Sequence, residues 1–149
     1  MSYVSTKTFA HNLGLSCCFR QWRASSHCRF LHGYALEIML TFQADILDAN
    51  GWVVDFGSLK SFKALLETMF DHKLLVAEDD PDRAHLEDLA RAGLASIVVV
   101  PATGCEAFAA LIYHTAKSWL LDNGYSPRRV TLTRVDVREH GANSASYFE

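Results

Sequence analysis

The sequence predicts an α+β fold in which an antiparallel β-sheet is covered on one face by two main helices. Residues 35–42 (ALEIMLTF) and 130–137 (VTLTRVDV) alternate apolar and polar residues, as half-buried strands do. Between them, residues 58–70 and 103–122 repeat apolar residues at the spacing of amphipathic helices. Strands followed by helices and then by a further strand are typical of a sheet with its helices on one side.

Composition indicates an ordinary globular protein. Of 149 residues, 50% are apolar and 21% are charged, and we find no internal repeat, low-complexity tract or linker, so we expect one domain over 1–149. The net charge of −3 and the lack of a basic stripe disfavour nucleic acid as a partner. No apolar run approaches the roughly 20 residues of a membrane span, and residues 1–9 are not an apolar leader, so we expect a cytoplasmic protein.

The first half of the chain predicts two strands joined by a loop. Residues 3–19 mix β-branched and aromatic residues as one long strand, with a bulge or bend at Gly14. Residues 20–30 are too charged and irregular for either periodicity, and residues 35–42 follow as the second strand. We expect these two strands to pair antiparallel.

The second half predicts the helices and the last clear strand. Asp55 or Ser58 can cap a helix that runs to Phe70. Residues 77–94 contain a short helix, and residues 97–100 form a short extended segment. A helix from Thr103 to about Asp122 then precedes the strand at 130–137.

The densest cluster of reactive side chains lies in residues 16–34, which hold three of the four cysteines. Cys28 and His32 are four residues apart, a spacing that suits a metal site, a nucleophile site or a buried structural thiol. Four cysteines in a cytoplasmic protein are expected to be reduced rather than paired in disulfides. Nearby arginines would lower the pKa of the Cys28 thiol.

Two further places suggest proton transfer and ligand binding. Asp71 beside His72 can orient the imidazole and raise its basicity, although a histidine at a helix end is also favoured by the helix dipole alone. Glu139 follows an alternating strand and precedes a Gly/Asn/Ser loop, where a carboxylate can accept two N–H groups from a ligand. A surface ion pair with Arg134 or Arg138 is the other interpretation. Glu106 in the first turn of a helix is expected from the dipole.

These segments together resemble the 6-pyruvoyl-tetrahydropterin synthase / 6-carboxy-tetrahydropterin synthase family over nearly the whole chain. The matching segments, in order, are LSCCF (15–19), CRFLHGY (28–34), GWVVDFGSLK (51–60), FDHKLL (70–75), TGCEAFA (103–109) and VDVREHGANSASY (135–147). No single one is decisive, but six in the same order are specific.

The resemblance implies a T-fold whose trimers close a β-barrel, with two trimers stacked as a homohexamer and sites between subunits. It implies a carbon–oxygen lyase that converts 7,8-dihydroneopterin triphosphate or a related pterin by triphosphate elimination or side-chain cleavage. The roles that it implies are a catalytic thiol at Cys28, proton-relay partners at Asp71 and His72, a pterin anchor at Glu139, and supporting pterin contacts at Glu106 and Thr103.

The resemblance also implies a zinc ion, but its three histidine positions fall on Phe19, His32 and Tyr34. Only His32 can ligate, since phenylalanine has no donor atom and a neutral tyrosine is a poor zinc ligand. In one interpretation a site is rebuilt around His32 with other residues, for which the candidates are Cys17, His27 and His140. In the other, zinc is absent and the remaining groups serve altered chemistry or binding alone.

Three functions therefore remain open at this point. The first is a pterin-processing enzyme, motivated by the thiol, the imidazole and the carboxylates. The second is a pterin- or purine-binding oligomeric module without catalysis, which keeps Glu139 and has lost the zinc site. The third is a structural or thiol-redox oligomer, motivated by Cys17, Cys18 and Cys28.

Overall fold

The structure is a computed structural model that describes residues 1–149. Its elements, in chain order, are β1 (Tyr3–Phe9), η1 (His11–Leu13), β2 (Ser16–Phe19), η2 (His27–Arg29), β3 (His32–Ala35), β4 (Glu37–Ala44), α1 (Lys60–Phe70), β5 (Lys73–Ala77), α2 (Arg83–Arg91), β6 (Ile97–Val100), α3 (Cys105–Asp122), β7 (Thr131–His140) and β8 (Asn143–Tyr147). The predicted helices and the strands at 35–42, 97–100 and 130–137 are therefore present.

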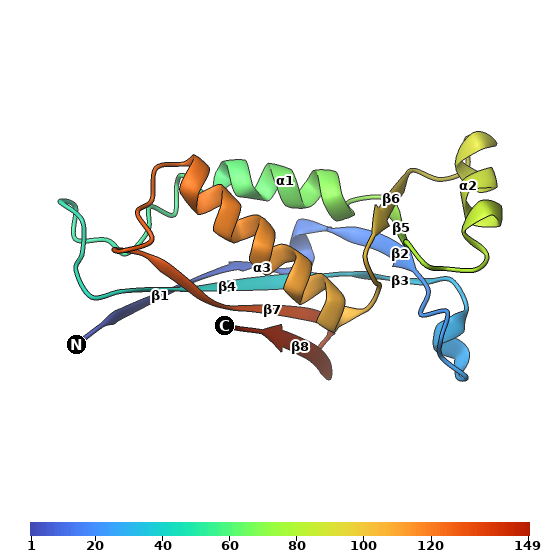
Figure 1. Ribbon diagram of the computed structural model, residues 1–149, viewed down its shortest axis with the longest axis horizontal. Helices are drawn as coiled ribbons and strands as arrows, with labels where there is room; N and C mark the ends of the chain where they lie inside the picture. Colours follow the sequence, from blue (N-terminus) through green and yellow to red (C-terminus); the bar gives the residue numbers. More distant parts are fainter.

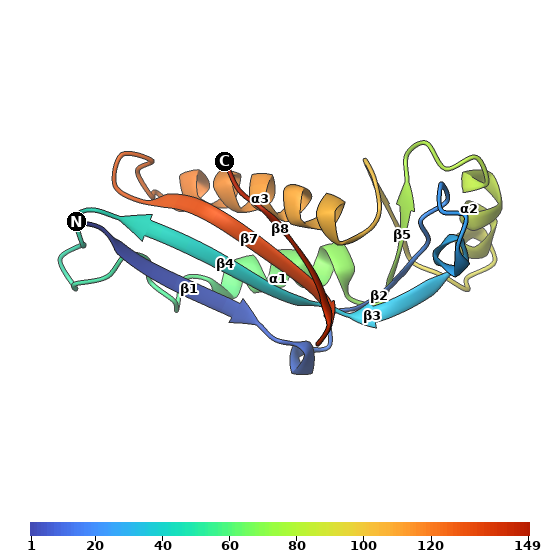
Figure 2. The same ribbon diagram turned by 90° about the horizontal axis from the view of Figure 1, so that it is seen from below.

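The larger sheet is fully antiparallel, with strand order β1-β4-β7-β8. Alternate residues of β4 and β7, such as Ile38, Leu40 and Val135, are completely buried, as the period-two pattern predicts. Helices α1 and α3 cover one face of this sheet and run along it (Figures 1 and 2). The prediction of two main helices on one face of an antiparallel sheet is confirmed for this part of the molecule.

A second sheet corrects the predicted single one. Its order is β3-β2-β5-β6, and although β2 pairs with β3 antiparallel, the β2–β5 and β5–β6 pairs are parallel. It lies at one end of the larger sheet, next to α2 (Figure 1). Strand β5 (KLLVA) escapes prediction because it is a continuous apolar run, buried from Leu74 to Ala77, rather than an alternating one.

The single strand predicted at residues 3–19 is also wrong, because the structure has two strands there, β1 and β2. A single turn, η1, follows β1, and Gly14 closes it with φ 73°, a conformation that glycine adopts without steric cost. The chain then leaves the larger sheet and enters the second as β2. Strand β1 pairs with β4 and β2 pairs with β3, so each half of the predicted strand has its own antiparallel partner.

The core joins the two sheets through aromatic side chains. Phe108 of α3 packs edge-on against Phe19 of β2 and Phe70 of α1, with ring centroids 5.1 and 5.4 Å apart, and all three are fully buried. Edge-to-face pairs of this kind stabilise a core beyond the burial of their area. They fix the end of β2, the end of α1 and the start of α3 relative to one another. Asp71 and His72 lie at the end of α1, and Thr103 and Glu106 lie at the start of α3.

None of the helices combines the length and the apolarity that crossing a bilayer requires. Closure of a barrel between several copies, like the single-domain organisation, stays a prediction.

Candidate functional site

Asp71 and His72 form an oriented pair between α1 and β5. His72 Nδ1 donates to Asp71 Oδ1 across 2.7 Å, and 86% of the His72 side chain is exposed. The backbone at His72 has φ 54°, a region that non-glycine residues rarely occupy, and its N–H donates to the Ser16 carbonyl at 2.6 Å. The helix end and β2 thus hold the imidazole outward with Nε2 free, an arrangement suited to proton transfer.

A groove of about 420 Å³ lies beside this imidazole. Its wall is mainly apolar, with Leu31 and Leu94 among its residues, while Cys18, His72 and Lys73 contribute polar atoms. Lys73 Nζ donates to the Ser96 hydroxyl at 3.0 Å. The cysteines that line this groove with His72 within one chain are therefore Cys17 and Cys18, neither of which the sequence singled out for this role.

Cys28 lies elsewhere in the chain. It sits half-buried in η2, where its carbonyl accepts from Gln21 N at 2.9 Å, beyond the C-terminal end of β2. His72 is tied instead to Ser16, at the N-terminal end of β2. These attachment points are five residues apart along the chain, a span of up to about 17 Å when extended. Cys28 is not among the residues that line the groove beside His72, so we expect a site that uses both residues to need a second copy.

Glu139, near the end of β7, lies close to a cysteine thiol and a tyrosine phenol. Burial raises the pKa of Cys105 to about 12, and the neighbouring Glu139 carboxylate contributes to that rise. Burial also raises the pKa of Tyr34, and Glu139, Cys28 and Cys105 raise it further. Glu139 thus has a thiol and a phenol near it, both protonated at neutral pH. Cys28 lies close enough to Tyr34 to contribute to the same rise in the pKa of the phenol.

Cys105 is a site residue that sequence reasoning missed. It is 7% exposed and opens α3, one residue before Glu106. Its position inside the TGCEAFA segment was the available signal, but a lone cysteine in a helix is more often a small apolar core residue.

Glu106 and Thr103 differ in whether their polar groups are available to bind a ligand. Glu106 is exposed in the first turn of α3, where the helix dipole favours it. Thr103 Oγ1 already donates to the Arg20 carbonyl at 2.6 Å, so its proton is used within the chain. A pterin contact from Thr103 would have to use the oxygen as an acceptor.

The three positions at which the resemblance implies zinc ligands do converge, but as an aromatic cluster. The Phe19 ring lies 5.0 Å from His32 and 6.2 Å from Tyr34, and the His32 and Tyr34 rings are 5.7 Å apart. Phe19 is fully buried and offers no lone pair. The raised pKa of Tyr34 keeps its phenol protonated. His32 is the one ligand here, and its Nδ1 donates to the Phe30 carbonyl at 2.7 Å.

The substitute ligands do not complete a site within the chain either. Burial raises the pKa of Cys17 to about 12, so without a metal ion it is a thiol. His140 Nδ1 accepts from Ala142 N at 3.2 Å, and His27 is exposed in η2. No three His, Cys, Asp or Glu side chains gather in a way that could hold a metal ion. The residues at this place do not fit a zinc ion.

Comparison with known sequences gives one family. A family model described as 6-pyruvoyl tetrahydropterin synthase matches residues 9–149. The 6-carboxy-5,6,7,8-tetrahydropterin synthase of Rickettsia typhi is 38% identical over 56 residues, which span 37% of this chain and 41% of that protein's length. The enzyme of the same name from Aquifex aeolicus is 27% identical over 140 residues, or 91% of this chain and 85% of that protein.

Solved structures share the fold. A protein from Wolinella succinogenes, described as uncharacterized, superposes with a TM-score of 0.80 at 21% identity and covers 99% of this chain and 98% of its own. The 6-pyruvoyl tetrahydropterin synthase of Plasmodium vivax superposes with a TM-score of 0.69 at 15% identity, with the same coverage of 99% and 98%. At these identities the likeness establishes the α+β architecture.

Proposed function

This chain belongs to the 6-pyruvoyl tetrahydropterin synthase family, and from that premise we propose that it is a pterin-processing lyase acting on 7,8-dihydroneopterin triphosphate or a close relative. The reaction is elimination of triphosphate or cleavage of the side chain, begun by removal of a proton from that side chain. The curated relatives named as tetrahydropterin synthases support this activity.

The observation that carries the proposal is the Asp71–His72 pair. A bond of 2.7 Å fixes the imidazole, the backbone at φ 54° holds it outward, and a groove of about 420 Å³ adjoins it. Uncommon backbone conformations of this kind cost about 1–3 kcal/mol and gather at functional sites. A protein that only binds a pterin has no need of an oriented, solvent-facing imidazole, which favours catalysis over binding alone.

The charges and neighbours of Glu139 and Cys28 suggest their roles. Glu139 accepts the N–H edge of the pterin ring, since the groups around it are neutral thiols and a phenol and no arginine is paired with it. Cys28 acts with His72 of a neighbouring copy in proton transfer. We propose a homo-oligomer, a trimer or a pair of trimers, located in the cytoplasm, with each site shared by two chains.

We further propose that this chemistry proceeds without zinc at Phe19, His32 and Tyr34. The cluster of three rings occupies the place where the metal would be held and supplies one donor atom in place of three. Proton transfer by the thiol and the imidazole then has to carry the reaction.

The test is to incubate the purified protein with 7,8-dihydroneopterin triphosphate, with and without added zinc, and to follow triphosphate release and the pterin products by chromatography. We expect turnover that added zinc does not increase. Removing a general acid–base group typically costs 10²–10⁴-fold, so His72→Ala should lower the rate at least about 100-fold.

His85→Ala is the matched control, since His85 is an exposed histidine on α2 that does not line the groove, and it should keep the wild-type rate. Absence of turnover under every condition would remove the proposal. If Glu139→Gln then abolished pterin binding in the inactive protein, the chain would be a binding module instead.

A further inference from the structure

The loop that carries Cys28 has no anchor in the core. No side chain between Phe19 and Leu36 is buried, whereas those two residues are fully buried. The apolar burial that fixes β2 and β5 is therefore missing over residues 20–31. One backbone hydrogen bond of 2.9 Å, from Gln21 N to the Cys28 carbonyl, spans the loop, and its other backbone hydrogen bonds join residues three apart. The position of the loop relative to the rest of the protein therefore has to be set by polar contacts.

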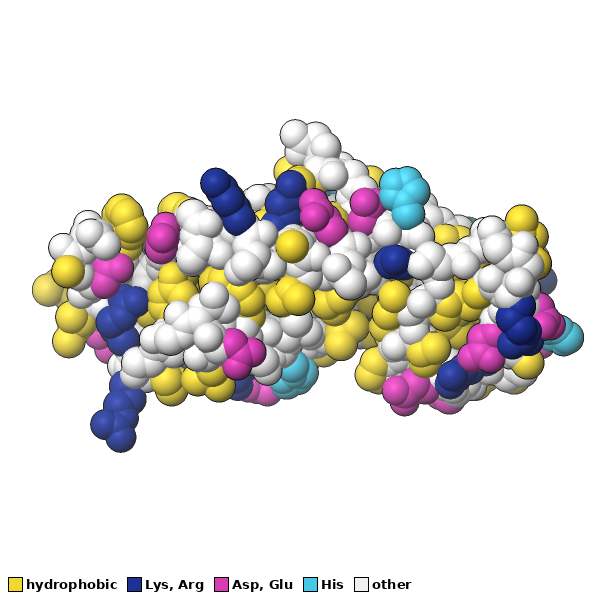
Figure 3. All heavy atoms as spheres, turned by 90° about the horizontal axis from the view of Figure 1, so that it is seen from above, with side chains coloured by type: hydrophobic (Ala, Val, Ile, Leu, Met, Phe, Trp, Pro, Cys, Tyr) yellow, Lys and Arg dark blue, Asp and Glu magenta, His cyan; other side chains and the backbone are white.

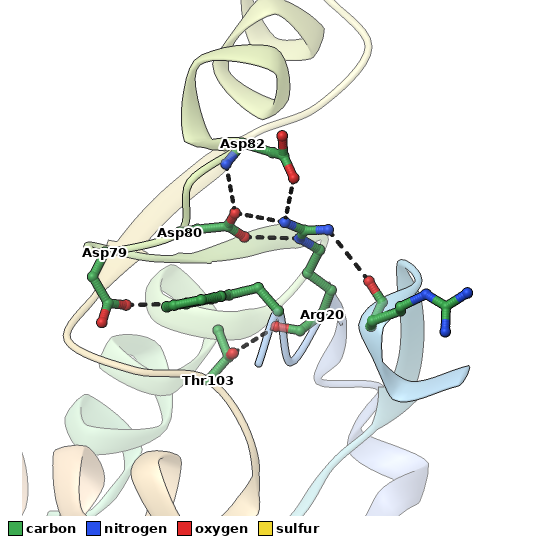
Figure 4. A network of polar contacts seen from close by, with 7 residues as sticks. Arg20, Asp79, Asp80, Asp82 and Thr103 are labelled. Carbon is green, nitrogen blue, oxygen red and sulfur yellow. Dashed lines mark hydrogen bonds and ion pairs between the residues drawn. The ribbon is translucent and has the colours of Figure 1, made fainter. Parts of the chain in front are cut away.

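Arg20 supplies the largest set of those contacts (Figure 4). Its guanidinium donates to both oxygens of Asp80, from Nε at 2.8 Å and from Nη2 at 2.7 Å, and Nη2 also donates to Asp82 at 2.7 Å. Nη1 reaches back to the Arg29 carbonyl, the neighbour of Cys28, at 3.5 Å. One side chain thus connects the two ends of the loop to a turn 60 residues away in sequence.

In the Arg20–Asp80 ion pair, the aspartate is buried and the arginine is partly exposed. The Asp80 side chain is 1% exposed and that of Arg20 is 19% exposed. Arg20 holds the pKa of Asp80 below its ordinary value, so the pair is charged at neutral pH. Two parallel N–H donors to one carboxylate fix direction as well as distance. Removing one partner of such a pair leaves a buried charge unsatisfied.

Further hydrogen bonds hold the start of the loop, from Thr103 before α3 and from Asp79 in the acidic turn. Thr103 Oγ1 donates to the Arg20 carbonyl, and Trp22 Nε1 donates to Asp79 at 3.1 Å. Arg23 pairs with the same Asp79. A space-filling view shows acidic and basic side chains gathered at the end of the molecule that carries α2 (Figure 3). The acidic turn at 79–82 therefore receives two arginines and one indole from the loop.

We propose that Arg20 is a positioning residue, which holds the Cys28 loop against the acidic turn 79–82 and so sets where the thiol meets its reaction partner. The ordering of the loop stands on the contacts above, and the catalytic consequence rests on the proposed function. Arg20 itself touches no reacting atom. It acts through the backbone of residues 21–29.

The central variant is the double substitution Arg20→Gln with Asp80→Asn. It removes the connection without leaving an unpaired buried charge, so the protein can fold even if either single variant cannot. Trp22→Phe is a milder variant that removes the donor to Asp79 and keeps the ring. Arg83→Gln is the control, because Arg83 pairs with Glu87 at 2.7 Å within α2 and makes no contact with the loop.

Two measurements need no substrate. We expect amide hydrogen exchange over residues 21–30 to speed up at least about tenfold in the double variant, with the core strands unchanged. We also expect the rate of Cys28 alkylation by iodoacetamide, followed by peptide mass mapping, to rise. Trp22→Phe should show a smaller change and Arg83→Gln none. Exchange and alkylation equal to the wild type in the double variant would overturn the positioning role.

Kinetics test the catalytic consequence separately. With the pterin triphosphate as substrate, the double variant should lower kcat about 10- to 100-fold while KM stays within about twofold, since misplacing a reacting group by 1 Å can cost 10²-fold. A mobile loop with unchanged kcat would overturn the link to catalysis. If the wild type has no activity, the proposed function fails, and the exchange and alkylation results still decide whether Arg20 orders the loop.

Discussion

Cys105 and Cys17 are held as neutral thiols by the protein around them. The pKa of each is raised from 9.0 to about 12, chiefly by burial. Burial also raises the pKa of Cys18. Reactive cysteines need thiolate character at neutral pH, so this environment argues against a redox role for Cys17 and Cys18. The neutral thiol at Cys105 suits a group that lies beside the Glu139 carboxylate.

This environment predicts a loss of stability at alkaline pH. The unfolded thiol ionises from pH 9.0 upward, while the folded one stays protonated until about pH 12, so the unfolded state binds fewer protons between these values. Stability is therefore fully present below pH 9 and falls by about 1.4 kcal/mol per pH unit for each such thiol above it. Urea titrations of the wild type and Cys105→Ser at pH 8 and pH 10.5 measure the difference.

Cys105→Ser should lose about 1–2 kcal/mol less than the wild type between these two pH values, since serine does not ionise there. Any cavity or hydrogen-bond effect of the substitution would lower stability by the same amount at both pH values. An identical decline in the two proteins would show that the Cys105 pKa is not raised on folding.

Sequence reasoning identified several candidate side chains and missed what surrounds them. Asp71 and His72 were candidates for proton transfer from the sequence, and the structure shows a direct hydrogen bond between them. The Arg20–Asp80 pair was not expected, because its partners are 60 residues apart and no local pattern joins them. Cys105 was missed because its relation to Glu139 depends on the packing of α3 against β7. Distant contacts of this kind need the fold before they can be inferred.

Strands β2 and β3 approach each other more closely than their side chains suggest. Gly33 pairs with Cys18 in the register of the two strands. A Cβ atom at Gly33 would lie 2.4 Å from the Cys17 carbonyl oxygen, which is backbone and cannot rotate away. Glycine is therefore required here for space, although the residue itself is exposed.

Gly33→Ala is expected to destabilise the protein by about 1–3 kcal/mol, the usual cost of inserting a methyl group where the structure must shift. Gly141→Ala is the matched control, since nothing lies within 4 Å of its Cβ position and its φ is not positive. Thermal or urea unfolding of both variants measures the difference. Equal stability of the two would show that β2 and β3 are free to separate.

At the level of elements, periodicity was a reliable guide only where one face is buried. Helices α1 and α3 and strands β4 and β7 were located because their apolar residues recur at 3.6 or 2.0 residues. Strand β5 has no such period, since four of its five residues are buried. The switch from β1 to β2 depends on Gly14 and one turn of η1, and the sequence pattern on either side of them is the same.

The whole molecule separates the groups that the proposed reaction needs. His72 is attached to the start of β2 and Cys28 lies beyond its end. Strands β1 and β8 are the outer strands of the larger sheet. Unpaired sheet edges favour pairing with another chain. In the cyclic oligomer that we propose, the Cys28 loop of one chain lies near His72 of the next.

This arrangement predicts complementation between two inactive proteins. Cys28→Ala and His72→Ala should each be inactive alone, but oligomers assembled from an equal mixture contain some interfaces with an intact Cys28 from one chain and an intact His72 from the other. Random assembly gives both intact residues at about one site in four, so about a quarter of the wild-type rate should return.

A mixture of Asp71→Asn with His72→Ala is the control and should stay inactive, because both substitutions damage the same pair on one chain. If mass spectrometry shows mixed oligomers and no activity returns from the first mixture, the site is not shared between chains.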